Sequence, residues 1–179
     1  MSAGELTRMV RDRQLPAQPI VIEANEAERA ALARRFGISS VEQLKAAVDL
    51  EQDGKAVLAR GRLRARIVQA CAISGEDFPV AIDEPVMLRF IQEGAIDPAL
   101  SADEDIEIEL SPEDCDEIEY SGDSFDLGEA VAQSLGLAID PYAEGPNADA
   151  VRTEKGIASD EDQAPSGPLA DALRALKGE

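Results

Sequence analysis

The feature that most restricts the fold is an alternation of residue types between positions 55 and 70. Apolar or small residues occupy every second position from Val57 to Ile67. The positions between them include four arginines: Arg60, Arg62, Arg64 and Arg66. Side chains that alternate with a period of two point to opposite faces of a β-strand. The segment is therefore predicted to be a strand with one apolar face and one arginine face, in a sheet with one face exposed to water.

Weaker patterns of the same kind predict the other strands of this sheet. They cover residues 19–23, 44–50, 78–91, 105–110 and 117–120. Most of these segments are rich in β-branched or other apolar residues at alternate positions, with polar residues between them. Several two-faced strands indicate a mainly antiparallel sheet, because parallel sheets are covered on both faces.

Two helices are predicted from capping residues and apolar spacing. The first has its N-cap at Asn25 and ends at Gly37, and the second covers residues 126–137 and is closed by Gly136. A capping pair at residues 39–42 predicts a further short helical turn. The expected fold class is α+β: a mainly antiparallel, twisted β-sheet of about five or six strands with two or three helices.

The chain is expected to divide into one folded domain and three less structured parts. These are a flexible N-terminal arm (1–18), an α+β domain (19–142), a disordered acidic linker (143–167) and a short amphipathic C-terminal segment (168–179). The last segment places Leu169, Leu173 and Leu176 at helical spacing and is a candidate docking segment. Folding back on the domain and docking on a partner fit this pattern equally well.

The charge of the chain excludes several classes of function. There are 17 Lys and Arg against 37 Asp and Glu, for a net charge of −20, and residues 96–179 carry 4 of the former and 23 of the latter. So acidic a chain is repelled by phosphate backbones and anionic lipid surfaces, which disfavours DNA binding, general RNA binding and a membrane role. No long apolar run appears, and a cytoplasmic protein is expected.

Nothing in the sequence favours an enzyme or a cofactor. The absence of histidine removes Ser-His-Asp and Cys-His mechanisms and imidazole metal ligands. Cys71 begins a Cys-Ala-Ile-Ser sequence in which Ser74 stands where a metal knuckle or redox pair would have a second sulfur. One thiolate does not make a zinc site, and Cys115 is the only other cysteine. No metal, no catalytic residue and no cofactor is predicted.

The arginine face has two interpretations. As a functional surface, Arg60, Arg62, Arg64 and Arg66 would bind the phosphates of RNA. As a structural feature, they would pair with carboxylates on a neighbouring strand, and Asp105, Glu107 and Glu109 have the same spacing with opposite charge. The sequence does not establish which strands are adjacent, and the structural role is favoured.

A second candidate surface is acidic. Its members are Asp103, Asp105, Glu107, Glu109, Asp116, Glu117 and Glu119. They would form either a solvated strand face or a binding surface for a basic partner.

Four segments in order give the chain a resemblance to a known family. They are residues 26–37, 61–80, 125–142 and 168–177. Together they resemble the YceD family, the large ribosomal RNA subunit accumulation proteins, in its alphaproteobacterial form. The resemblance covers roughly residues 18–142 and the C-terminal segment. Many members have a second cysteine three residues after the first, where this chain has Ser74, which argues against a metal or redox role here.

The resemblance implies a bacterial cytoplasmic factor that supports the synthesis, processing or stability of 23S rRNA. It also implies an association with large-subunit biogenesis and no established catalytic activity. We therefore predict a non-enzymatic ribosome-biogenesis factor that acts through a protein partner, a large-subunit ribosomal protein or assembly factor. The 23S rRNA would be reached indirectly or through the arginine strand. The alternatives are an acidic protein-binding module unrelated to ribosomes and a divergent metal-binding protein that uses Cys71 and Cys115.

Overall fold

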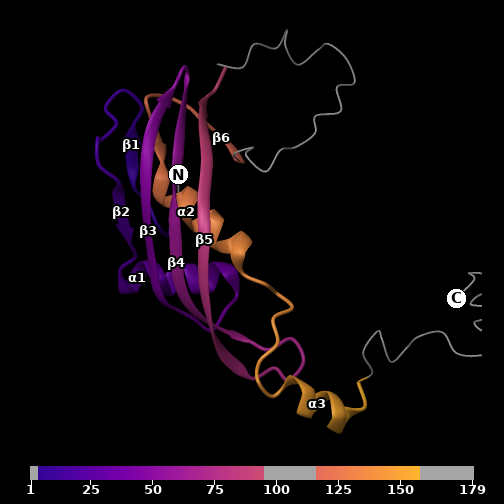
Figure 1. Ribbon diagram of the computed structural model, residues 1–179. Helices are drawn as coiled ribbons and strands as arrows, with labels where there is room; N and C mark the ends of the chain where they lie inside the picture. Colours follow the sequence, from indigo (N-terminus) through magenta and orange to yellow (C-terminus); the bar gives the residue numbers. More distant parts are fainter. Residues whose placement is uncertain (1–3, 95–115, 158–179) are drawn as a thin grey trace, which may run out of the picture.

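The computed structural model describes residues 4–94 and 116–157. Its elements, in chain order, are β1 (Met9–Arg11), β2 (Ile20–Glu23), α1 (Glu26–Phe36), β3 (Ser40–Asp53), β4 (Ala56–Ala70), β5 (Asp77–Gln92), β6 (Asp116–Tyr120), β7 (Ser124–Asp126), α2 (Leu127–Ala138) and α3 (Ala148–Lys155). Figure 1 shows the long strands side by side, with α1 and α2 behind them.

The main sheet has five strands in the order β2-β3-β4-β5-β6. All neighbours are antiparallel except β5 and β6, which are parallel. β1 and β7 form a separate two-stranded antiparallel sheet. The α+β prediction is therefore confirmed, and the arginine strand β4 lies in the centre of the sheet.

The predicted helical turn at residues 39–42 is wrong, because β3 already begins at Ser40. The Ser39 hydroxyl donates a hydrogen bond to Asp77 at 2.6 Å instead of capping a helix. Val41 pairs with Ile67 of β4 and its side chain is buried. This burial in the sheet overrides the local capping pattern.

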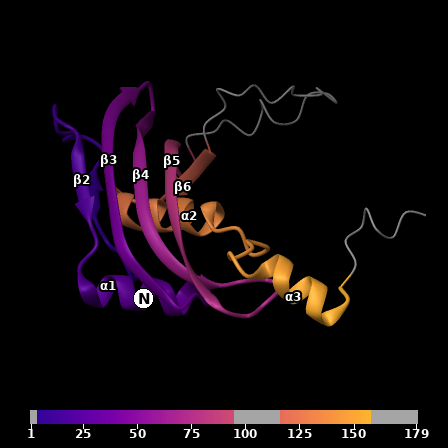
Figure 2. The ribbon, with the colours of Figure 1, turned by 60° about the horizontal axis from the view of Figure 1, so that its bottom comes forward.

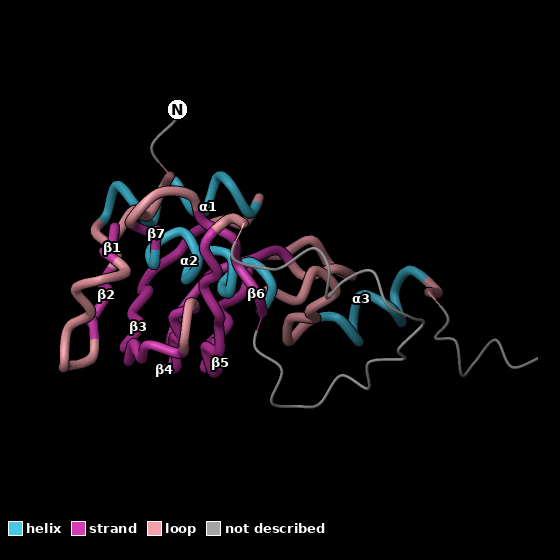
Figure 3. The backbone as a smooth tube through the Cα atoms, turned by 90° about the horizontal axis from the view of Figure 1, so that it is seen from above, coloured by secondary structure: helices cyan, strands magenta, loops and turns pink. Residues whose placement is uncertain are grey.

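Helices α1 and α2 and the β1–β7 pair lie on one side of the main sheet (Figures 2 and 3). α1 has the predicted N-cap, in which Asn25 accepts from the Glu28 N–H and Glu28 accepts from the Asn25 N–H. Gly37 ends the helix at φ 66°, a left-handed conformation that costs glycine little. Both ends of α1 are thus set by the residues that predicted them.

α2 begins as predicted but ends later. The Asp126 carboxylate caps it by accepting from the N–H groups of Gly128 and Glu129. Gly136 does not close the helix, which continues to Ala138. A Cβ at Gly136 would lie 2.8 Å from the Phe36 ring. The glycine therefore permits close packing of α2 against the end of α1.

The N-terminal segment differs from the flexible arm that the sequence indicated. Leu6 is fully buried, and β1 pairs with β7. Arg8 forms two hydrogen bonds with Glu28 of α1, at 2.8 and 3.1 Å. A Cβ at Gly128 would lie 2.5 Å from the Leu6 carbonyl oxygen, so this segment crosses α2 in direct backbone contact. Gly128 and β7 lie more than a hundred residues further along the chain, so no local sequence pattern predicts these contacts.

The predicted linker also differs where the structure describes it, since it contains α3. This helix lacks an apolar period and is stabilised by polar contacts that such a pattern does not show. Arg152 pairs with Glu144 and, at 3.2 Å, with Asp149, and Gly156 caps the C-terminus at φ 62°. The rest of the predicted linker, the C-terminal segment and the predicted strand 105–110 lie outside the described residues.

The core lies between the sheet and the two larger helices. It is mostly aliphatic, as the scarcity of aromatic residues requires. Phe90 of β5 and Phe125 of β7 stack with centroids 4.1 Å apart, which joins the two sheets. Gly61 lies at a close approach of β4 to β3, where a Cβ would be 2.1 Å from the Ala47 carbonyl oxygen.

Candidate functional site: the exposed face of the main sheet

The main sheet has a face opposite α1 and α2 (Figure 1), and the burial pattern of β4 places the arginines on it. We call it the open face; within the described chain no helix covers it. From the strand register and the burial pattern its residues include Val21 and Glu23 of β2, Gln43, Lys45, Ala47, Asp49 and Glu51 of β3, Leu58, Arg60, Arg62, Arg64, Arg66 and Val68 of β4, and Ala81, Asp83, Pro85, Met87 and Arg89 of β5. Leu58, Val68 and Arg89 are half-buried, and the others are exposed. The predicted arginine face of the strand is confirmed.

The arginines pair with carboxylates, but not with those that the sequence offered. Arg62 and Arg64 share Asp83 of β5, the latter at 3.3 Å. Arg60 lies 4.0 Å from Glu51 of β3. The carboxylates proposed from their spacing (Asp105, Glu107 and Glu109) lie outside the described residues, as does Asp103.

The pKa of Asp83 reflects the positive charges around it. The hydrogen bond from Arg62 is the main cause that lowers the pKa of its carboxyl group, and the positive charges of Arg62 and Arg64 add to this effect. Lys45 stands in the same cross-strand row, opposite Arg64. Asp83 therefore pairs with two arginines, and Lys45 adds a third cation to the same row.

Sequence reasoning missed Lys45 and Asp83 as members of this surface. Each lies in a predicted strand, at a polar position of the alternating pattern. That pattern was the available signal that the side chain lies on an exposed face. Their place beside Arg64 depends on the pairing register, which joins residues 19 positions apart on each side. No pattern within one strand contains that register.

The acidic candidate surface is described only in β6. Asp116, Glu117 and Glu119 are exposed there, and Glu117 lies 3.7 Å from Arg89 of β5. β6 pairs with residues 88–92 of β5 alone, so the remainder of that edge, from Asp77 to Met87, has no strand partner in the described chain. Pro79 and Pro85 remove two N–H donors from this part of the edge.

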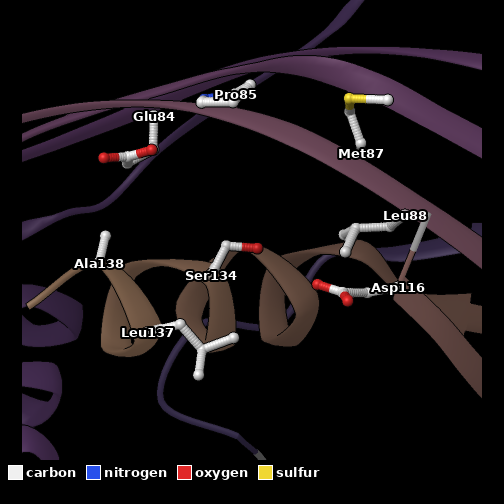
Figure 4. A pocket seen from close by; sticks show the side chains of 8 residues that line it. All are labelled: Glu84, Pro85, Met87, Leu88, Asp116, Ser134, Leu137 and Ala138. Carbon is white, nitrogen blue, oxygen red and sulfur yellow. The ribbon is translucent and has the colours of Figure 1, made fainter. Parts of the chain in front are cut away.

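A groove of about 450 Å³ lies beside the first residue of β6, between β5 and α2 (Figure 4). It is lined by Glu84, Pro85, Met87, Leu88, Asp116, Ser134, Leu137 and Ala138. Leu137 is 81% exposed, although it is apolar. The groove combines two carboxylates with an apolar floor, and it brings together three elements that the sequence does not show to be neighbours.

Cys71 lies just after β4 and is buried. Its sulfur accepts from the backbone N–H groups of Ile73 and Ser74, at 3.4 and 3.3 Å. Hydrogen bonding by the Ser74 side chain, and then by backbone groups of Ser74 and Gly145, lowers the pKa of the thiol to about 7. In residues 4–94 and 116–157 no group of three or more Cys, Asp or Glu side chains is arranged to hold a metal ion. Cys115 lies outside those residues.

The candidate docking leucines (Leu169, Leu173 and Leu176) also lie outside the described residues. No helix that the structure describes is long and apolar enough to cross a membrane.

The molecule is thus an α+β protein whose central sheet has one face covered by helices and one exposed, charged face. The chain belongs to the YceD family, described as large ribosomal RNA subunit accumulation protein YceD, whose family model matches residues 59–177. The match begins within β4 and contains the four arginines and Cys71. No curated protein and no solved structure matches the chain. The family indicates a role in the accumulation of large-subunit ribosomal RNA.

Proposed function

We propose that this protein is a non-enzymatic factor of the bacterial cytoplasm that supports the synthesis, processing or stability of 23S rRNA. The family match over residues 59–177 is the observation that carries this proposal. The protein would act by binding, and its partner would be a large-subunit ribosomal protein or an assembly factor.

The electrostatics of the molecule support a basic protein partner. With a net charge of −20, the chain attracts basic proteins and increases their rate of association. Asp116, Glu117 and Glu119 present exposed carboxylates on β6. Asp116 also lines the groove between β5 and α2. A basic, partly apolar segment of a partner would find both charge and contact area there.

Depletion of the protein tests the role. We expect depletion to lower mature 23S rRNA and 50S subunits while 16S rRNA stays normal, and expression of the wild-type chain to restore both. The measurement is a sucrose-gradient subunit profile with quantified rRNA. An unchanged profile after depletion would contradict the proposed function.

Co-purification at low salt tests the partner. Large-subunit proteins should remain bound after RNase treatment, and the variants Asp116→Lys and Glu119→Lys should lose them. Glu154→Lys is the matched control, because Glu154 is an exposed carboxylate on α3, away from β6. Capture dominated by non-ribosomal proteins would instead favour an acidic binding module unrelated to ribosomes.

A further inference from the structure

The four arginines of β4 are not equivalent, because their cross-strand neighbours differ. Arg60 stands opposite Asp49, and Glu51 lies 4.0 Å away. Arg66 stands between Gln43 and Ala81, which carry no charge, and the exposed Glu42, at the bulge beside Gln43, forms no ion pair with it in the described chain. The open face is therefore divided into a balanced end around Arg60 and a basic end.

We define the basic end as Lys45, Arg62, Arg64 and Arg66. Asp83 is the carboxylate of β5 that lies among them, in the row of Lys45 and Arg64. On β2, Glu23 stands opposite Lys45 at the edge of the patch. Four cations face these two carboxylates and Glu42 at the bulge beside Gln43, which still leaves a local excess of one positive charge in a strongly acidic protein.

Stability does not account for this arrangement. The side chains of Arg62 and Arg64 are 58% and 72% exposed, and ion pairs so exposed contribute at most about 1 kcal/mol each. Like charges at alternate positions of one strand face repel one another. An anion that bound across the row would relieve this repulsion and engage the planar guanidinium groups, which suit phosphate oxygens.

The geometry of the basic end suits a phosphate backbone better than a folded protein surface. Alternate residues of a strand are about 6.8 Å apart, close to the separation of neighbouring phosphates along a nucleic acid strand. On β3 and β5 the uncharged neighbours in these rows are small or short: Gln43, Ala47, Ala81 and Pro85. On β2 the exposed Val21 completes the row of Arg62, at the edge of the patch. No aromatic side chain of the kind found at the centre of protein interfaces stands in these rows of the described chain.

We propose that the basic end binds the phosphate backbone of RNA, without preference for base sequence. The choice of 23S rRNA as that RNA rests on the function proposed above. The described residues of the open face include no aromatic ring on which a base could stack, so phosphate contacts carry the binding. Binding is correspondingly weak and depends strongly on salt.

The net charge of −20 does not prevent this contact. At 0.1 M salt the Debye length is about 10 Å, so exposed charges beyond the patch are largely screened. The local charge of the basic end then decides whether a phosphate strand can approach. At very low salt the rest of the molecule repels RNA, so the useful range of the experiment is 50–200 mM.

The test compares two variants that each remove one positive charge from the same face of the same strand. Deproteinised 23S rRNA is titrated with the wild type, Arg66→Gln and the matched control Arg60→Gln, between 50 and 200 mM KCl. Each phosphate contact contributes about 0.7–0.9 to the slope of log affinity against log salt. Arg66→Gln should lower that slope by this amount and weaken binding about five- to eightfold at 0.1 M salt. Arg60→Gln should leave both nearly unchanged, and all three proteins should melt alike.

Equal effects of the two variants, or no binding by the wild type at 50 mM KCl, would overturn the inference. The inference would also be overturned if, after RNase treatment, the wild type keeps a protein partner that Arg66→Gln has lost. That result would indicate an acidic protein ligand. The depletion experiment is independent of these results. Normal 23S rRNA after depletion, combined with a selective defect of Arg66→Gln in RNA binding, would reject the proposed function and retain the phosphate site.

Discussion

At the scale of single residues, Cys71 shows how a turn can favour a charged side chain. The turn after β4 is closed by hydrogen bonds from the Cys71 N–H to the Glu76 carbonyl oxygen and from the Gly75 N–H to the Cys71 carbonyl oxygen. This closure directs the N–H groups of Ile73 and Ser74 at the sulfur. The Ser74 side chain is the largest cause of the lowered pKa, and the backbone groups of Ser74, Gly145 and Ile73 add to it. Donors that point at a sulfur stabilise the thiolate more than the thiol, so the pKa falls to about 7.

The lowered pKa predicts a dependence of stability on pH. An unfolded thiol has a pKa near 9.0, so the folded state releases its proton more readily. The resulting stabilisation is absent below pH 7, grows between pH 7 and 9, and is complete above pH 9. We expect the difference in melting temperature between the wild type and Cys71→Ser to increase over this range, because serine does not titrate there. A difference that stays constant from pH 6 to 9.5 would show that the turn does not stabilise the thiolate.

At the scale of elements, the segment that holds β1 is expected to be an integral part of the fold. Leu6 is fully buried, whereas Met9, three residues later, is 59% exposed. Leu6→Ala should lower the free energy of unfolding by about 2–5 kcal/mol, as for other buried leucines. Met9→Ala, the control in the same segment, should change it by less than about 0.5 kcal/mol. Urea unfolding measures both, and equal small effects would mean that this segment is the loose arm that its sequence indicates.

The elements that could be predicted are those specified by local chemistry. The alternation in β4 and the cap of α1 each lie within a dozen or so consecutive residues, and both were found. The packing of Leu6 and the start of β3 at Ser40 depend on partners distant in the chain. The same division applies to the candidate site: the four arginines of β4 follow from a period of two, whereas the place of Lys45 and Asp83 beside Arg64 follows from register. The different surroundings of Arg60 and Arg66 therefore could not be predicted from the sequence.

At the scale of the whole molecule, charge is distributed very unevenly along the chain. Residues 1–95 carry 13 basic and 14 acidic residues, and residues 96–179 carry 4 and 23. The first part supplies β2 to β5 and therefore the open face. The nearly neutral part of the chain thus forms the scaffold of the sheet, and the acidic part contributes β6, the helices that follow it and the rest of the excess charge. This distribution allows one protein to present a locally basic surface despite its overall charge.

Such an excess of negative charge predicts that moderate salt stabilises the protein. Like charges repel most strongly in the compact state, where they are closest together. Raising the ionic strength from 0.01 to 0.15 M shortens the Debye length from about 30 to about 8 Å, which screens this repulsion. Exposed ion pairs such as Arg60–Glu51 are weakened as well, but each contributes at most about 1 kcal/mol and they act over short distances. We expect the melting temperature to rise by at least about 2 °C, the shift that about 1 kcal/mol produces in a chain of this size.

NaCl and KCl should act equally, because screening depends on ionic strength and not on the cation. A fall in melting temperature over the same range would show that local ion pairs, and not long-range repulsion, dominate the electrostatics of the folded chain.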